Sequence, residues 1–170
     1  MKKEYIKTIT YNGLIAALYV ALTLLSIPIS FGQIQFRIAE ILVIFCFFNK
    51  KNCLGIMLGT FLANLFSTLG LWDLLFGTFA TALTCLFVCN SKHLIVSIIW
   101  PVVFNAIIIA IELYIVFGFG PIELLFINMA YVAFGELVVM IGSYILFMLF
   151  KKRKEFAFIV NGNQNLDFKF

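Results

Sequence analysis

Long apolar runs, interrupted by short polar stretches, dominate the chain. They predict helices at about residues 8–27, 36–49, 53–70, 73–89, 94–117 and 122–150. A helix that crosses a membrane needs about 20 mostly apolar residues, and the second run is shorter than that. We expect it to be tilted, or to continue the polar stretch Pro28–Gln35 that precedes it. The pattern therefore predicts an all-α integral membrane protein, a six-transmembrane-helix bundle.

The composition strengthens this prediction. Hydrophobic residues make up 64% of the 170 residues and charged residues only 12%, against about 25% charged in soluble domains. We expect one membrane domain over residues 1–154 and a disordered cytoplasmic tail over residues 155–170, which lack a helical period. Lys2, Lys3 and Lys7 precede the first run as in a signal peptide. No small-x-small cleavage site follows, so we expect the first helix to be retained.

Basic residues flank alternate ends of the predicted helices. They cluster before the first helix and after the second, the fourth and the sixth. Loops rich in Lys and Arg face the cytoplasm, so both termini are expected there. The loops near residues 28–36, 71–73 and 118–121 then lie outside, and Arg37 is the one basic residue on that side.

Polar side chains within the helices gather in the predicted outer half. The candidate binding residues of this kind are Gln35, Arg37, Glu40, Asn64, Asp73, Asn105, Glu112 and Glu136. A charged residue at a helix centre costs about 2.5–3.5 kcal/mol on insertion, so such residues are functional candidates. Asn105 and Glu112 are seven residues apart and share a helix face. The pattern predicts a polar cavity in the outer half of the bundle.

The charge balance of this half indicates the kind of ligand. Its four acidic residues face a single cation, Arg37, which favours a cationic or donor-rich ligand and disfavours an anion. Trp72 and Phe76 lie in the same half. Their rings could stack on a flat heterocycle or hold a cation, so both join the predicted substrate-binding set.

Structural roles compete with binding for some of these residues. Arg37 and Glu40 are three residues apart, and on a helix that spacing allows an ion pair, which we expect to hold Glu40 in place. Asp73 could cap the amino end of its helix. Asn64 could make an ordinary hydrogen bond between helices.

Small residues recur every fourth position on two predicted helices. Gly13, Ala17 and Ala21 form such a strip on the first helix, and Gly55 and Gly59 form one on the third. Small residues allow a second helix to approach closely. Each strip therefore serves either internal packing or a partner protein.

No catalytic residue, metal site or cofactor is predicted, and the chain is not expected to be an enzyme or to bind nucleic acid. The sequence lacks a phosphate-binding loop. Its single histidine, His93, leaves intramembrane serine or metal proteolysis without a base and ligands. Of the four cysteines, Cys85 and Cys89 lie one helical turn apart, and apolar packing is expected there rather than metal binding.

Four stretches of the chain resemble the QueT family. They are Leu18–Leu24, Pro28–Glu40, Gly59–Asn64 and Trp72–Thr81. The resemblance covers about residues 8–150 and implies a substrate-binding S component of an energy-coupling factor (ECF) importer in the plasma membrane. It further implies a T component and two cytoplasmic ATPases as partners. The strip Gly13, Ala17 and Ala21 would then dock onto the T component.

The resemblance also implies the substrate class, a queuosine precursor such as 7-aminomethyl-7-deazaguanine or a related 7-deazapurine such as queuine. A guanine edge offers two adjacent donors to one carboxylate, and an aminomethyl ammonium needs a second. Two alternatives stay open: an S component for another cationic, thiamin-like vitamin, and a membrane enzyme or scaffold that does not transport.

Overall fold

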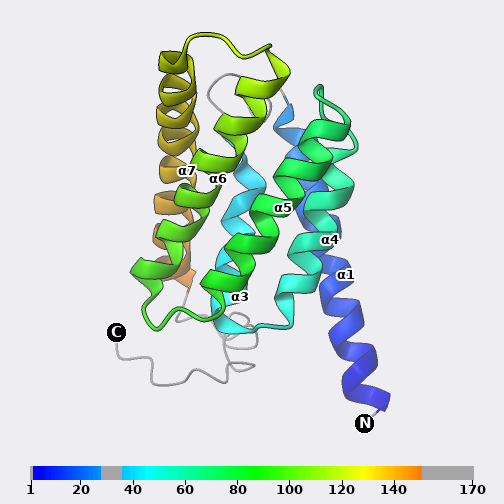
Figure 1. Cartoon of the computed structure of the whole chain (residues 1–170). Coiled ribbons are helices and arrows are strands. Elements are labelled where there is room, and N and C mark those ends of the chain that lie inside the picture. The colour runs from blue at the N-terminus through cyan, green and yellow to red at the C-terminus, as the bar shows by residue number, and fades with distance from the viewer. Residues whose placement is uncertain (1, 28–35, 151–170) are drawn as a thin grey trace.

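The computed structural model describes residues 2–27 and 36–150, and these ranges contain helices and no strand. In chain order the elements are α1 (Lys2–Leu25), the 3-10 helix η1 (Ile38–Val43), α3 (Ile44–Phe48), α4 (Asn52–Asn64), α5 (Leu71–Val88), α6 (Leu94–Val116) and α7 (Ile122–Phe150) (Figure 1). The predicted all-α class is confirmed. The predicted loop Pro28–Gln35 and the tail lie outside the described residues.

Four helical segments are long and apolar enough to cross a membrane. They are Tyr5–Leu25, Leu71–Val88, Leu94–Val116 and Ile122–Phe150. Two shorter apolar stretches, Ile38–Phe48 and Asn52–Asn64, lie between the first and second of these. The chain therefore has the helices of a protein that crosses the membrane several times, and six crossings remain a prediction.

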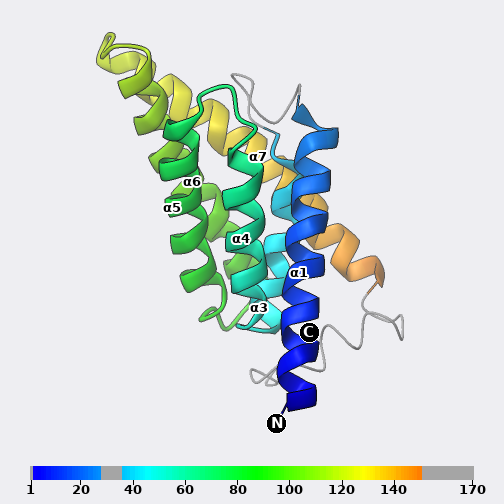
Figure 2. The same cartoon turned by 90° about the vertical axis from the view of Figure 1, so that its right-hand side faces the viewer.

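The second predicted helix begins as η1 and continues as α3 in the interior of the bundle (Figures 1 and 2). Most of its side chains are buried, including Val43, Cys46 and Phe48. A helix surrounded by protein needs no polar face, which explains its continuous apolar run. The Ser143 hydroxyl on α7 donates to the Ile41 carbonyl at 2.8 Å and ties η1 to its neighbour.

Helices α1 and α4 run side by side (Figure 2) and approach closely at two glycines. A Cβ added at Gly59 would lie 2.7 Å from the Tyr19 Cβ, and one at Gly55 would lie 2.7 Å from the Asn12 carbonyl oxygen. Asn12 Oδ1 also accepts a hydrogen bond of 2.6 Å from the Gly55 amide, which ties α1 to α4 at this close approach. The Gly55 and Gly59 strip therefore serves internal packing.

The connections between elements lie at two opposite ends of the bundle. In Figure 1 the α3–α4 and α5–α6 connections lie at the same end as the start of α1, and the α4–α5 and α6–α7 connections lie at the other. Lys50 and Lys51 belong to the first of these connections and Lys92 to the second. The basic residues of the described chain thus concentrate at one end, which we call the basic end.

Candidate functional site

A set of buried polar side chains lies where η1, α4, α5, α6 and α7 come together, and we call it the polar cluster. Its members are Arg37, Glu40, Asn64, Asp73, Asn105, Glu112 and Glu136, and each is at most 6% exposed. Asn105 and Glu112 share one buried face of α6, as their spacing predicted. Burial of charged groups is costly unless they are paired or bound, so this cluster is the candidate site.

The carboxylate of Asp73 accepts hydrogen bonds from two side chains, Arg37 and Ser67. Arg37 Nη2 donates to Asp73 Oδ1 at 3.0 Å, which makes a buried ion pair, and the Ser67 hydroxyl donates to Asp73 Oδ2. Asn64 Nδ2 donates to the Asp73 backbone carbonyl at 2.9 Å. Helix α5 has no side-chain cap at its N-cap residue Gly70. Asp73 is thus the ion partner of Arg37, and Asn64 joins α4 to α5.

The ion pair that the structure shows for Arg37 is with Asp73, and its interaction with the predicted partner Glu40 is electrostatic. Arg37 is the N-cap of η1, with φ −77° and ψ 80°, so its backbone is not helical and its side chain leaves toward α5. The helical spacing rule holds only inside a helix. Glu40 Oε1 instead accepts a hydrogen bond of 2.6 Å from the Tyr19 hydroxyl of α1. Sequence reasoning missed Tyr19, and the available signal was a hydroxyl-bearing residue within an apolar run.

The third predicted helix was too long. Helix α4 ends at Asn64, whereas the apolar run had predicted a helix to residue 70. The Ser67 hydroxyl accepts the Leu69 amide at 3.1 Å, and such local bonds compete with a helix. The turn that follows α4 therefore places Ser67 beside Asp73.

Gly77 makes room for the ion pair, and sequence reasoning missed it. A Cβ added there would lie 2.7 Å from Asn64 Nδ2 and 3.2 Å from Arg37 Nη1. Gly77 lies one helical turn after Asp73 on α5. A glycine at that spacing from a buried carboxylate was the available signal.

Several side-chain polar atoms of the polar cluster, most of them acceptors, lack a hydrogen-bond partner among the described residues. Glu112 lacks one at both carboxylate oxygens, and Asn105 at both side-chain amide atoms. Glu136 lacks one at Oε1 and Glu40 at Oε2. An unsatisfied buried polar atom costs about 1–3 kcal/mol, and such atoms need an explanation. Arranged together, they can receive the donors of a bound molecule.

The charge of Arg37 acts on the whole cluster. It interacts electrostatically with Asp73, Glu40 and Glu112, and also with Glu136. Asp73 forms a direct ion pair with Arg37. The three glutamates of the cluster therefore have no cation of their own to pair with directly among the described residues. The cluster is therefore suited to a ligand that carries donors or positive charge.

The other predicted site residues lie apart from this network. Trp72 is 43% exposed and its ring contacts Phe76, with centroids 5.9 Å apart. Both rings lie in the first two turns of α5, next to Asp73. Gln35 lies outside the described residues. A stacking role for the two rings stays a prediction.

The small-residue strip of α1 faces outward. Gly13, Ala17 and Ala21 are exposed, and a Cβ added at Gly13 would meet nothing within 4 Å. The neighbouring Ala16 and Tyr19 are buried against α4 instead. Two strips with the same sequence pattern thus have different surroundings, and docking through the α1 strip stays a prediction.

Comparison with known proteins gives two matches. The sequence model of the family described as "QueT transporter" matches residues 9–152. A protein named "Queuosine precursor transporter QueT", from Lactococcus lactis subsp. cremoris (strain MG1363), is 43% identical over 70 residues. That alignment covers 39% of this chain and 41% of the relative, so the match spans less than half of either protein.

No solved structure matches the chain. Both matching descriptions name transporters, which confirms the prediction of a transport protein and not an enzyme. Together with the apolar helices, they make the chain a multi-pass membrane protein. Because the family model covers most of the sequence, the chain belongs to the QueT transporter family.

Proposed function

We propose that this chain is the substrate-binding S component of an ECF-type importer and that it binds a queuosine precursor at the polar cluster. The observation that carries the proposal is the buried carboxylate of Glu112, whose two oxygens both lack a partner among the described residues. Membership of the QueT transporter family and the name of the Lactococcus relative support the substrate class.

The chemistry of a 7-deazaguanine matches these open atoms. Its guanine edge presents a ring N–H and an amino group side by side, and a carboxylate with two open oxygens can accept both. Glu112 is the member of the cluster whose carboxylate is open at both oxygens, so we assign it the guanine edge. The amide of Asn105 lies on the same buried face of α6 as Glu112, and we assign it to a neutral polar group of the ring.

An aminomethyl group on the ligand would meet the remaining acids. Glu136 Oε1 and Glu40 Oε2 each lack a partner among the described residues, and the two glutamates interact electrostatically. An ammonium between them would relieve their mutual repulsion and supply the missing donors. We therefore propose that Glu136 and Glu40 bind the ammonium. The ion pair of Arg37 and Asp73 has a structural role and holds η1 against α5.

Energy for uptake must come from other proteins in this proposal, because the sequence has no phosphate-binding loop. The partners are a T component, docked on Gly13, Ala17 and Ala21, and two cytoplasmic ATPases. The outward exposure of these three residues supports that role. We place the protein in the plasma membrane with six crossings and both termini in the cytoplasm, because its basic residues concentrate at the end where α1 begins.

Reconstituted uptake tests this function. Proteoliposomes that contain the chain, the T component and both ATPases should accumulate labelled 7-aminomethyl-7-deazaguanine only when ATP is enclosed with the ATPases. Vesicles without the T component are the control and should show background uptake. Equal uptake with and without the partners would contradict the S-component role. Uptake of thiamin in place of the deazapurine would reassign the substrate to another cationic heteroaromatic vitamin.

A further inference from the structure

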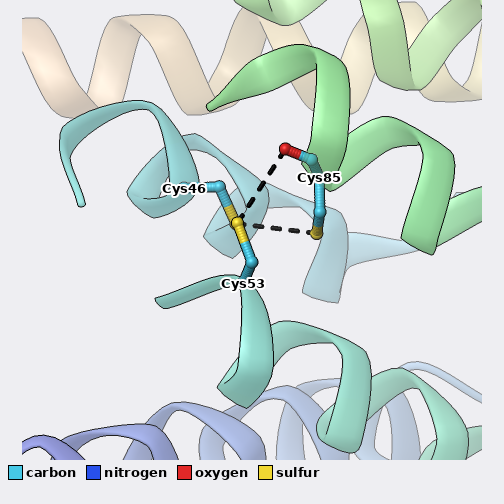
Figure 3. Close-up of side chains that lie close together, drawn as sticks. All are labelled: Cys46, Cys53 and Cys85. Carbon is cyan, nitrogen blue, oxygen red and sulfur yellow. Dashed lines mark hydrogen bonds between the residues drawn. The ribbon is translucent and has the colours of Figure 1, made fainter. Parts of the chain in front are cut away.

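Three cysteines from three different helices meet at the basic end of the bundle. Cys46 of α3, Cys53 of α4 and Cys85 of α5 point toward one another (Figure 3). Their Sγ atoms all lie within 4.8 Å of one another, and the Sγ atoms of Cys46 and Cys85 are 3.6 Å apart. All of these thiols are free. We call this group the thiol cluster.

The thiol cluster is separate from the polar cluster. Asp73 lies in the first turn of α5 and Cys85 in its last turn, and twelve residues of α-helix span about 18 Å. Cys53 lies in the first turn of α4, close to the α3–α4 connection. Nearby, Lys50 Nζ donates to Asn90 Oδ1 at 3.0 Å and bridges the two connections of the basic end.

Sequence spacing pointed to a different pair of cysteines. Cys85 and Cys89 lie one turn apart, but Cys89 Sγ is directed to the Leu86 carbonyl at 3.4 Å. The structure instead brings Cys46 and Cys53 to Cys85 from other helices. Cys53 Sγ donates to the Cys85 backbone carbonyl at 3.8 Å, and Cys46 Sγ contacts Cys85 Sγ, so the three cysteines contact one another and do not pack against carbon alone.

The geometry of the thiol cluster matches that of thiolate ligands around one metal ion. With a zinc–sulfur distance of about 2.3 Å, two sulfurs of a tetrahedral site lie about 3.8 Å apart. The 3.6 Å between Cys46 and Cys85 is close to that value. The other Sγ–Sγ distances are at most 4.8 Å, so bringing them to about 3.8 Å requires the sulfur atoms to move by about 1 Å. Small side-chain rotations suffice for that.

We propose that Cys46, Cys53 and Cys85 form a binding site for a thiophilic d10 cation such as Zn²⁺. On binding, each thiol that becomes a ligand releases one proton to water. Cys46 and Cys85 are buried, whereas Cys53 is half-buried and offers the approach for the ion. The bound ion would link α3, α4 and α5 at the basic end.

Titration with the metal alone tests this site without any transport assay. Untagged protein in detergent, reduced with a phosphine that does not chelate metals, should retain one Zn²⁺ per chain after gel filtration. Co²⁺ should give the sulfur-to-metal charge-transfer absorption of thiolate ligation. Cys46→Ser, Cys53→Ser and Cys85→Ser should each weaken binding by about 100-fold. Cys89→Ser leaves all three thiols of the cluster in place, so it should weaken binding less than any of these three substitutions.

Folding of the variants is checked separately, through the melting temperature of each metal-free protein. Zn²⁺ should raise the melting temperature of the wild type and leave that of Cys53→Ser unchanged. The half-buried position of Cys53 makes this the best tolerated substitution. Failure of the wild type to retain one ion, or Cys53→Ser binding as tightly as the wild type, would overturn the proposal.

Discussion

Arg37 and Asp73, thirty-six residues apart in the chain, form a buried ion pair with 3.0 Å between Nη2 and Oδ1. The pair fixes the chain before η1 against the start of α5. Because Asp73 is paired with Arg37, its carboxylate is not available to a cationic ligand. Glu40, Glu112 and Glu136 are left as the acidic groups with open oxygens.

Asp73→Asn should destabilise the protein strongly, because it leaves the guanidinium of Arg37 buried without its ionic partner. Breaking one side of a buried pair costs about 3–5 kcal/mol. Denaturant unfolding in detergent measures this loss. Glu123→Gln, at an exposed acid on α7, is the matched control and should change stability by less than about 0.5 kcal/mol. Equal effects of the two substitutions would contradict the role of the pair.

Gly77→Ala should weaken the contact between α4 and α5. The added Cβ would lie 2.7 Å from Asn64 Nδ2 and would push that group off the Asp73 carbonyl. Overpacking of this kind costs about 1–3 kcal/mol, measured by unfolding. The control is Gly142→Ala on α7, where an added Cβ meets nothing within 4 Å and alanine favours the helix. If Gly77→Ala also left the free energy of unfolding unchanged, the close approach at Gly77 would not contribute to stability.

Tyr19→Phe should leave Glu40 without the donor that its Oε1 has in the native protein. Hydrogen bonds to charged groups contribute about 1.5–3 kcal/mol, so the ligand-free protein should lose about that much unfolding free energy. Tyr5→Phe, at a residue that is 71% exposed, is the control. A stability loss no larger than that of the control would mean that the Tyr19 hydroxyl does not hold Glu40.

Substitutions at Glu112 and Glu136 should separate the two parts of the ligand. Glu112→Gln replaces one acceptor oxygen with a donor that faces the guanine edge. It should therefore weaken the binding of 7-aminomethyl-7-deazaguanine and of its neutral nitrile analogue alike, by about 100-fold or 2.7 kcal/mol. Glu136→Gln should weaken the aminomethyl compound at least about tenfold more than the nitrile. Competition binding measures both. If instead Glu112→Gln weakened the aminomethyl compound more than the nitrile and Glu136→Gln weakened both equally, Glu112 would bind the ammonium and Glu136 the guanine edge.

Ala17→Trp should abolish uptake that depends on the T component while leaving ligand binding intact, because its bulk covers the exposed strip of α1. Phe79→Trp is the control, since Phe79 is 57% exposed on α5 and lies on another helix. Parallel uptake and binding assays make the comparison. Loss of binding together with uptake would show that Ala17 is part of the folded core.

Some of this architecture could be predicted from the sequence because it depends on local periodicity. The all-α class and the shared face of Asn105 and Glu112 follow from helical spacing alone. The strips of α1 and α4 show the limit of that reasoning, because they have the same pattern. Only the packing of Gly55 and Gly59 against α1 separates them.

The partners within the polar cluster could not be predicted, because they come from distant parts of the chain. Arg37 lies just before a 3-10 helix, with a non-helical backbone, so the rule for pairs within a helix could not point to its direct ion partner Asp73. Its partner Asp73 and the partner of Glu40, Tyr19, are set by how whole helices pack. The convergence of Cys46, Cys53 and Cys85 has the same origin.

Equilibrium titration of the purified wild-type protein with 7-aminomethyl-7-deazaguanine tests the central claim most directly. The open oxygens of Glu112, Glu136 and Glu40 predict saturable binding at one ligand per chain, with a Kd below about 1 μM, or about −8.2 kcal/mol. Absence of binding by this compound, its nitrile analogue and queuine, with saturable binding of thiamin in the same preparation, would contradict the account.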